Sequence, residues 1–415
     1  MSPWTRIGWR NLGRNRRRTI LTACGLAVGY CGVVVLAGLF DGVIGEMLRN
    51  GTGILTGQIQ IHHPDYLPDR DVFRTLGGRE GTDVAAVLVA AEADPDVAAA
   101  APRVQAGGLV STGAATSGVI LIGIDPEREA RTTLILGALT DGRPPALGAN
   151  EAVIGRELAR LLDAGVGDEL VVVAPAADGS MGNDLFTVSG IYASGIGELD
   201  VSAVLVPIDA LQGLLALPPE RIHEIAVRVP DPWRAPAAAA RLTARLGGDS
   251  LAVQDWTTLR PELVDYARLA ESSYWMLLGV VFTMAIFGVA NTLLMATYER
   301  RYEIALLRAL GAGPWGLVRA ILAEAVALGG ISIAIGAAAA AVIVVWWHHV
   351  PLDLSWLFGG FSMMGSFIRP VLRAEYPVEM FFRTAGALLL TAVLASLYPA
   401  YRAIRIPPAE TLAGR

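Results

Sequence analysis

The sequence contains no lysine, because all 33 of its basic residues are arginine. A phosphate-binding loop of the type G-x-x-x-x-G-K-[ST] uses its lysine to reach the β- and γ-phosphates of a nucleotide. The chain therefore cannot form that loop. Any ATP hydrolysis of this class, with its bound ATP and Mg²⁺, must come from a partner chain. We predict that the chain itself is not an enzyme and holds no cofactor.

Cysteine and histidine are also scarce. The two cysteines, Cys24 and Cys31, lie in one apolar run, where a single helix would keep them unbonded. We interpret them as small apolar core residues. The five histidines show no spacing typical of a metal site, and no G-x-S-x-G sequence is present. We therefore predict no metal site and no catalytic residue.

Charged residues make up only 17% of the 415 residues, whereas 53% are hydrophobic and the mean hydropathy is +0.48. An average soluble domain carries about 25% charged residues. The apolar residues gather in four runs, each long enough to cross a hydrocarbon core of about 30 Å. We predict membrane spans at residues 19–40, 274–298, 316–347 and 384–401. The first run is too long for a cleaved signal peptide, so we expect an uncleaved anchor.

The charges are distributed asymmetrically between these spans. Segments 1–18, 299–319 and 402–415 carry 13 arginines and three glutamates, whereas segments 41–273 and 348–383 carry 20 arginines and 35 acidic residues. Arginine-rich flanks remain on the cytoplasmic side of a membrane. We therefore expect a cytoplasmic basic segment at 1–18, a cytoplasmic loop at 299–315 and a cytoplasmic tail at 402–415. Residues 41–273 and the loop 348–383 should face the other side, and no nucleic-acid partner is predicted.

The long segment 41–273 has the pattern of a folded α+β domain. Apolar, β-branched runs predict strands, and alanine- and leucine-rich stretches between them predict helices, including 83–93, 156–163 and 259–271. Gly107 and Gly108, Gly142, 165–167 and 178–183 are interpreted as turns. The predicted fold class is an α-helical membrane protein with four transmembrane helices and a large α+β extracytoplasmic domain between helices 1 and 2.

The cytoplasmic loop contains a short amphipathic helix, predicted at 302–310. Its apolar patch comprises Ile304, Ala305, Leu306 and Leu307, with Glu303 and Arg308 at the edges. Gly311 and Gly313 should end the helix, and Pro314 can begin the next one. Two interpretations remain open: a helix that lies on lipid, or a helix that docks into a groove of a cytoplasmic partner.

The run from Glu299 to Ala312, followed by Glu324 and Ala325, resembles the signature of the FtsX-like permease family of ABC transporters. The ending at 399–412 is similar to the ending of that family. Patterns at 57–66, 123–129, 151–159, 166–170, 186–195 and 352–356 resemble its lipoprotein-releasing, LolC/LolE-type branch.

The resemblance implies that the loop helix couples the permease to a cytoplasmic ABC ATPase dimer. The implied coupling residues are Glu299, Glu303, Ile304, Leu307, Arg308, Leu310, Gly311 and Gly313. It further implies a bacterial inner-membrane location with the large domain in the periplasm, and a second permease chain, identical or of the LolC/LolE type. The implied mechanism is mechanotransmission, in which movement of the ATPase is relayed through the helices to the periplasmic domain.

The resemblance also implies that acyl chains from membrane lipid or lipoprotein enter between the outer ends of the first two spans. The candidates are Val34, Leu36, Leu39, Phe40, Val43, Met47, Tyr274, Leu277, Leu278 and Val281. Three functions stay open: release of lipoproteins to a periplasmic carrier, efflux of a peptide, antibiotic or other amphiphile through an adaptor and an outer-membrane duct, and control of a periplasmic hydrolase. We expect Glu324 to pair with Arg319 or Arg402 rather than to contact substrate.

Overall fold

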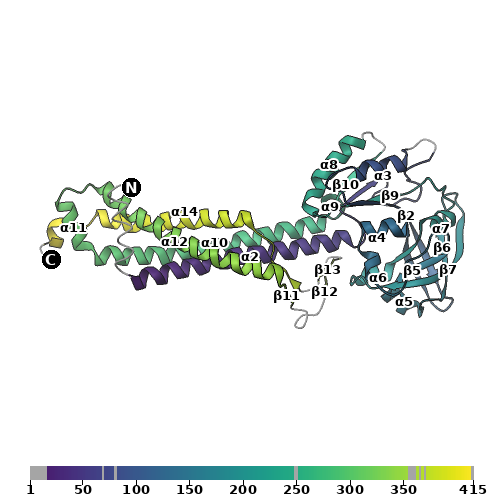
Figure 1. Cartoon of the computed structure of the whole chain (residues 1–415), viewed down its shortest axis with the longest axis horizontal. Coiled ribbons are helices and arrows are strands. Elements are labelled where there is room, and N and C mark those ends of the chain that lie inside the picture. The colour runs from purple at the N-terminus through teal and green to yellow at the C-terminus, as the bar shows by residue number, and fades with distance from the viewer. Residues whose placement is uncertain are drawn as a thin grey trace. The chain divides into compact units, whose positions relative to one another are not determined.

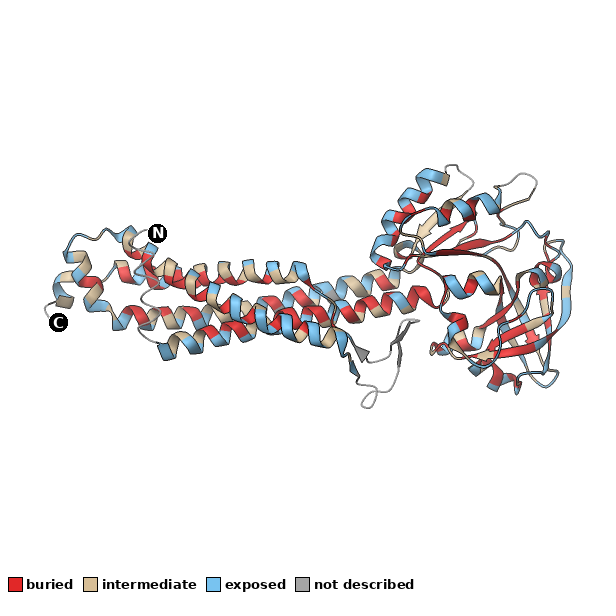
Figure 2. Cartoon of the chain, in the orientation of Figure 1, coloured by how far each residue is buried: buried red, intermediate tan, exposed pale blue. Residues whose placement is uncertain are grey.

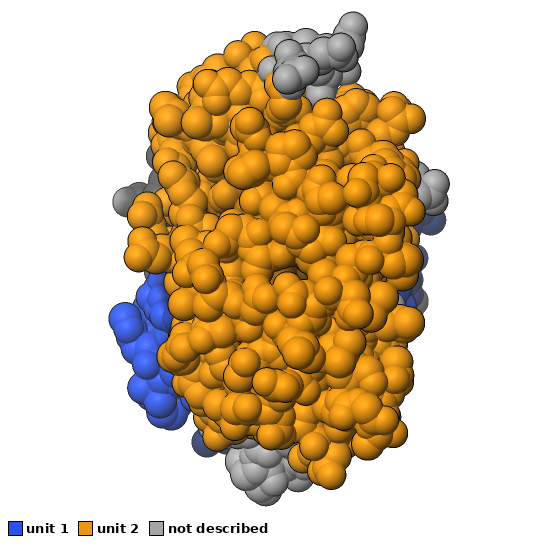
Figure 3. Space-filling view, turned by 90° about the vertical axis from the view of Figure 1, so that its right-hand side faces the viewer, with its two compact units in different colours: residues 1–43, 268–353, 371–415 blue, residues 44–267, 354–370 orange. Residues whose placement is uncertain are grey.

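The computed structural model describes residues 16–67, 70–78, 82–246, 251–353, 361–363, 366–368 and 371–412. Its contacts divide the chain into two compact units. The helical unit comprises residues 1–43, 268–353 and 371–415, and the strand-rich unit comprises residues 44–267 and 354–370. Figure 3 shows one face of the strand-rich unit in orange. Most of the predicted segment 1–18 lies outside the described residues.

Four helices are long and apolar enough to cross a membrane (Figure 1). They are α2 (Arg16–Gly53), α10 (Pro261–Glu299), α12 (Pro314–His349) and α14 (Val378–Ile404). Each contains one predicted span and extends beyond it at both ends. The helix predicted at 259–271 is confirmed from Pro261 onward, but it does not end at 271: these residues are the first turns of α10, because proline fits the start of a helix.

The four helices share an apolar core in the helical unit. Its buried residues come from all four helices and include Tyr30, Val34, Val289, Leu328 and Leu388. Large apolar side chains on the opposite faces are exposed, as the pale blue helix faces in Figure 2 show. This distribution suits helices surrounded by lipid. Cys31 packs against the core as expected, whereas Cys24 is exposed, so its interpretation as a core residue is wrong.

The strand-rich unit is built on a ten-stranded sheet. Six of its strands form a closed ring in the order β2, β3, β8, β5, β7 and β6, because β6 pairs with both β7 and β2. The bounds are β2 (Ala99–Ser111), β3 (Thr116–Ile124), β5 (Glu151–Gly155), β6 (Glu169–Pro175), β7 (Met181–Tyr192) and β8 (Ala203–Pro207). The strands β9 (Glu224–Arg228), β1 (Ile59–His62) and β10 (Ala252–Asp255) extend from β2, and β4 (Leu139–Gly142) pairs with β7.

The turn predicted at Gly107 and Gly108 is wrong, because both residues lie inside β2. The first part of β2 pairs with β9, and its last three residues pair with β6. A Cβ built on Gly108 would lie 2.8 Å from the carbonyl oxygen of Val173 in β6. Glycine is therefore required where β2 passes from one part of the sheet to the other. The predicted turn at 178–183 is confirmed in part, because residues 176–180 connect β6 to β7 in a hairpin.

Short helices complete the unit and make it α+β. They are α3 (Val84–Glu92), α4 (Pro126–Thr132), α5 (Arg156–Leu162), α6 (Gly197–Ser202), α7 (Ile208–Leu214), α8 (Ala235–Leu246) and α9 (Trp256–Leu259), with 3₁₀ turns at Ile135–Ala138 and Pro232–Arg234. Helix α3 confirms the prediction at 83–93, with Asp83 accepting hydrogen bonds from the amides of Ala85 and Ala86 as its N-cap. Within the predicted loop 348–383 lie four short strands, Leu352–Asp353, Phe361–Met363, Ser366–Ile368 and Val371–Leu372.

Candidate coupling site

The short helix α11 (Arg301–Ala309) connects α10 to α12 and confirms the helix predicted at 302–310. Leu310 is its C-cap, and Gly311 follows with φ +90°, a conformation that favours glycine. The amide of Ala312 then donates to the carbonyl oxygen of Leu307 at 2.9 Å, which closes the end of the helix. Pro314 begins α12 one residue after Gly313, its N-cap. The sharp exit expected from the two glycines is therefore present.

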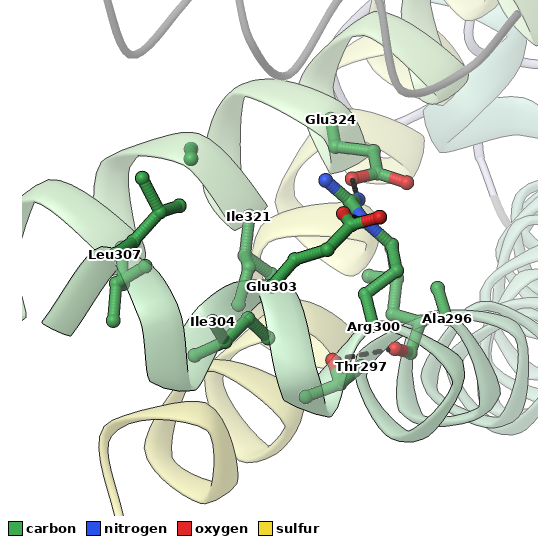
Figure 4. Close-up of a pocket in the computed structure, with 11 residues that line it drawn as sticks. Ala296, Thr297, Arg300, Glu303, Ile304, Leu307, Ile321 and Glu324 are labelled. Carbon is green, nitrogen blue, oxygen red and sulfur yellow. Dashed lines mark hydrogen bonds and ion pairs between the residues drawn. The ribbon is translucent and has the colours of Figure 1, made fainter. Parts of the chain in front are cut away.

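The inner face of α11 packs against its own chain. Ile304 is 8% exposed and lies in a cluster with Leu317 of α12 and Ala403 of α14, and Leu307 packs against the same cluster. Figure 4 shows Ile304 and Leu307 beside Ile321 of α12. The implied coupling residues Ile304, Leu307 and Leu310 therefore do not share one exposed face. The first two residues face the neighbouring helices, and only Leu310 faces outward.

The outward face of α11 carries a different apolar row. Tyr302, Leu306 and Leu310 are spaced four residues apart, and they are 58%, 46% and 76% exposed. We call these three residues the outer stripe. Trp315, at the start of α12, is 74% exposed. The helical spacing of the outer stripe is visible in the sequence, but the sequence has two apolar rows on one helix and does not show which of them faces α12.

The charged residues of the loop are engaged within the chain. Arg18 NH1 lies 3.0 Å from Glu299 Oε2, and Arg300 lies 3.4 Å from both Glu303 Oε2 and Glu324 Oε2. Glu324 therefore pairs with Arg300, whereas the expected pairing with Arg319 or Arg402 is not found among the ion pairs of the described residues. Arg300 lies 24 positions from Glu324 in the sequence, so no local pattern could identify the pair.

Arg308 was expected to be a flanking surface charge, but its side chain points into the helical unit. Its NH1 donates to the carbonyl oxygens of Ile404 at 2.7 Å and Ile406 at 2.6 Å. These oxygens lie at the C-terminal end of α14, where the helix leaves carbonyl groups without intrahelical partners. Arg308 therefore attaches α11 to the end of α14.

A cavity of about 50 Å³ lies between α10, α11 and α12, lined by Arg300, Glu303, Glu324 and apolar neighbours (Figure 4). Ligand pockets usually enclose about 300–1,000 Å³. The cavity is thus far smaller than a small-molecule site. Among the residues that the structure describes, no group of three or more histidine, cysteine, aspartate or glutamate side chains is placed to hold a metal ion.

The acyl-chain candidates do not form one open surface. Val34, Tyr274 and Leu278 are buried in the helical unit, where Tyr274 and Leu278 pack against Val33 and Ala37. Met47 is buried as well. The remaining candidates are the exposed Leu36 and Phe40 and the half-buried Leu39, Val43 and Val281, while the side chain of Leu277 lies outside the described residues.

A wider groove between α2 and α10 lies nearer the N-terminal end of α2. Its volume is about 620 Å³, and its lining includes Leu21, Gly25, Val28, Phe282 and Leu388. None of the acyl-chain candidates lines it except Val281.

The comparisons with known proteins assign this architecture. The model of the MacB-like periplasmic core domain matches residues 19–245, and that of the FtsX-like permease C-terminal domain matches residues 275–408. The chain belongs to the MacB- and FtsX-like family of ABC transporter permeases. It is an inner-membrane, multi-pass permease, and α11 lies inside the FtsX-like part.

Curated relatives are similar to this chain over most of its length. The permease is 27% identical to the lipoprotein-releasing system transmembrane protein LolC of Xylella fastidiosa, over 77% of this chain and 78% of that one. It is 24% identical to LolC of Neisseria meningitidis, over 98% of both chains. The macrolide export ATP-binding/permease protein MacB of Burkholderia lata is 26% identical over 98% of this chain and 56% of that one. Among solved structures, the periplasmic region of MacB from Actinobacillus actinomycetemcomitans covers 52% of this chain at 15% identity and a TM-score of 0.36.

Proposed function

We propose that this permease works by mechanotransmission with a separate ABC ATPase dimer that docks on the outer stripe of α11. The observation that carries the proposal is the exposure of Tyr302, Leu306 and Leu310 on a helix whose opposite face is fixed to α12 and α14. A partner that covers an exposed apolar row of this kind gains affinity from desolvating it. ATP and Mg²⁺ would be bound by the partner, since this chain has no lysine for a phosphate-binding loop.

The proposed topology follows the arginine asymmetry. Both termini and the loop 299–315 lie in the cytoplasm, and residues 41–273 and 348–383 lie in the periplasm. Two permease chains, identical or of the LolC/LolE type, would flank the ATPase dimer. Closure of the ATPase dimer would then move the two α11 helices and, through the long helices, the periplasmic domains.

The proposed substrate class is lipoprotein, released from the outer leaflet of the inner membrane to a periplasmic carrier. Its support is that the relatives from Xylella and Neisseria are named as lipoprotein-releasing proteins. Exposed Leu36 and Phe40 on α2, with half-buried Val281 on α10, would receive the acyl chains. A second candidate, MacB-like efflux of an amphiphile, is supported by the match to the macrolide exporter over 98% of this chain.

The test uses the permease, the ATPase and any second permease chain in proteoliposomes that also contain a triacylated lipoprotein. ATP should transfer the lipoprotein to a soluble periplasmic carrier, and a non-hydrolysable ATP analogue should not. A photo-crosslinking residue at Phe40 should capture the lipoprotein before ATP is added, whereas one at Val342, exposed on α12, should capture only phospholipid. ATP-driven loss of a macrolide from the vesicles without lipoprotein transfer would favour efflux instead.

A further inference from the structure

Helix α11 packs against the short C-terminal helix α15 (Pro408–Leu412), and three further contacts hold it to the long helices. Arg300, just before its first residue, reaches Glu324 on α12. Ile304, in its middle, packs between Leu317 of α12 and Ala403 of α14. Arg308, in its last turn, donates to two carbonyl oxygens at the end of α14. All three points join α11 to α12 or α14.

The connection to α10 is of a different kind. Arg300 is the single residue between the end of α10 at Glu299 and the start of α11 at Arg301, with φ −106° and ψ 15°. The backbone thus leaves helical dihedral angles at this residue, although the amide of Arg300 still donates to the carbonyl oxygen of Ala296 and its own carbonyl oxygen accepts from the amide of Ile304. A break of one residue is a place where a chain can bend. The backbone of Arg300 is therefore the joint between α10 and α11.

The side chain of Arg300 sets the angle at this joint. It is 22% exposed, and its Nε and NH1 lie 3.4 Å from Glu303 of α11 and Glu324 of α12, whose side chain is 11% exposed. Figure 4 shows the two carboxylates converging on the guanidinium group. A guanidinium presents its donors in a rigid plane, so contact with two carboxylates restricts its orientation more than a lysine ammonium would. Partial burial makes such contacts stronger than those of exposed pairs.

We propose that Arg300 is a positioning residue that holds α11 at a fixed angle to α12, so that movement of α11 is transmitted to α12. The inference rests on the proposed ATPase docking at α11. With the three attachments intact, a displacement of the outer stripe carries α12 and α14 with it, and α10 follows through the joint. Without the contact between Arg300 and Glu324, α11 would turn about the joint and much of the displacement would be absorbed there.

The first experiment needs only the permease in nanodiscs. Hydrogen exchange of the α11 amides is measured for the parent, Arg300→Gln, Arg300→Lys, Glu324→Gln and the swapped pair Arg300→Glu/Glu324→Arg. Arg319→Gln is the matched control, since this exposed arginine on α12 takes part in none of the described ion pairs. Exchange should rise about tenfold in Arg300→Gln and Glu324→Gln, less in Arg300→Lys, and return toward the parent in the swapped pair. Equal exchange in all variants would overturn the proposal.

The second experiment adds the ATPase and measures ATP turnover by the complex. Arg300→Gln should lower kcat several-fold while the KM for ATP and the amount of bound ATPase stay unchanged, and the swapped pair should recover part of the loss. A variant that binds less ATPase would show Arg300 to be part of the docking surface, which contradicts the positioning role. If the parent itself binds no ATPase, the proposed function fails, and the exchange experiment still decides whether Arg300 holds α11.

Discussion

Gly42 of α2 and Arg373, in the segment that leads to α14, touch through their backbones. A Cβ built on Gly42 would lie 1.8 Å from the carbonyl oxygen of Arg373. One turn earlier, the carbonyl oxygen of Gly38 accepts a hydrogen bond from the amide of Glu375 at 2.9 Å. Glycines four residues apart lie on one helix face, and here they allow residues 373–377 to cross α2 at close range. The start of α14 is therefore anchored on α2.

Replacing Gly42 should disturb this crossing. Because the nearest atom is backbone, Gly42→Ala forces residues 373–375 away from α2 and should destabilise the helical unit by about 1–3 kcal/mol. Gly32→Ala on the same helix is the control, since a Cβ there meets no atom within 4 Å. Thermal unfolding of the permease in nanodiscs should show a lower Tm for Gly42→Ala alone. Equal Tm values for the two variants would show that the contact is not tight.

Three buried charged side chains form an ionic cluster in the strand-rich unit. Arg103 of β2 and Glu224 of β9 lie directly opposite each other, with Arg103 NH1 3.4 Å from Glu224 Oε1, and Arg103 Nε lies 3.1 Å from Glu129 Oε2 on α4. All three side chains are buried. Arg103→Leu leaves two buried carboxylates without this cation and should cost about 3–5 kcal/mol of unfolding free energy.

The control for Arg103 is Arg143→Leu. Arg143 pairs with Glu151 at the surface, and a pair of that kind contributes about 1 kcal/mol or less. Limited proteolysis of the full chain in detergent, followed over a urea series, should show strand-rich fragments lost at lower urea only for Arg103→Leu. Equal midpoints for the two variants would show that Arg103 does not stabilise the unit.

Arg241 of α8 should make the stability of the strand-rich unit depend on pH. It donates to Asp94 Oδ1 at 2.7 Å and Oδ2 at 2.9 Å, and these hydrogen bonds hold the pKa of Asp94 below its ordinary value. A lowered folded pKa stabilises the fold above the unfolded pKa of about 3.9, and the contribution is lost as pH falls through the folded value. Arg241→Gln should therefore lower the stability at pH 7, and the difference from the parent should shrink below about pH 4. A difference that stays constant down to pH 2 would contradict this linkage.

The proposed topology predicts from which side of the inner membrane an introduced cysteine can be labelled. In a variant with Cys24 and Cys31 replaced by serine, a cysteine in place of Gly179 should react with a membrane-impermeant thiol reagent in cells with a permeabilised outer membrane. A cysteine in place of Ala312 should react only after the inner membrane is opened. Both residues lie outside the helices and strands; Gly179 is exposed and Ala312 is half-buried. Labelling of position 312 while the inner membrane is still intact would show that this loop faces the periplasm, which contradicts the proposed topology.

The sequence predicted elements whose signals are local. Helix α3 has an N-cap, Asp83, and an uninterrupted run of helix formers, and β6 alternates buried and exposed residues. Strand β2 could not be predicted, because its alanines and the pair Gly107 and Gly108 have low strand propensity, and its conformation depends on pairing with β9 and β6. Tertiary pairing overrides local preference there.

The sequence predicted where the candidate site lies along the chain, but it did not predict which face of α11 is buried. The amphipathic pattern located α11 within one residue, but the burial of Ile304 depends on Leu317 and Ala403, which belong to two other helices. The contact between Arg300 and Glu324 likewise depends on the angle between α10 and α12. Such contacts depend on how the helices pack in three dimensions, and a single sequence does not reveal that packing.

The central claim is that a separate ATPase covers the outer stripe of α11. Leu306→Asp and Leu306→Arg each place a charge on this row, and a charge desolvated in a protein groove should weaken binding by about 2–4 kcal/mol. A helix resting on anionic lipid would tolerate arginine but not aspartate. Leu161→Asp, on exposed α5 of the strand-rich unit, is the matched control.

The most direct measurement is the affinity of the purified permease in nanodiscs for the ATPase, together with ATP turnover by the complex. Both Leu306 variants should bind the ATPase at least about 30-fold more weakly and lose ATP turnover, while Leu161→Asp should behave as the parent. If both Leu306 variants bind the ATPase with parental affinity, docking at the outer stripe is contradicted. The same holds if Leu306→Asp loses affinity for the ATPase while Leu306→Arg behaves as the parent.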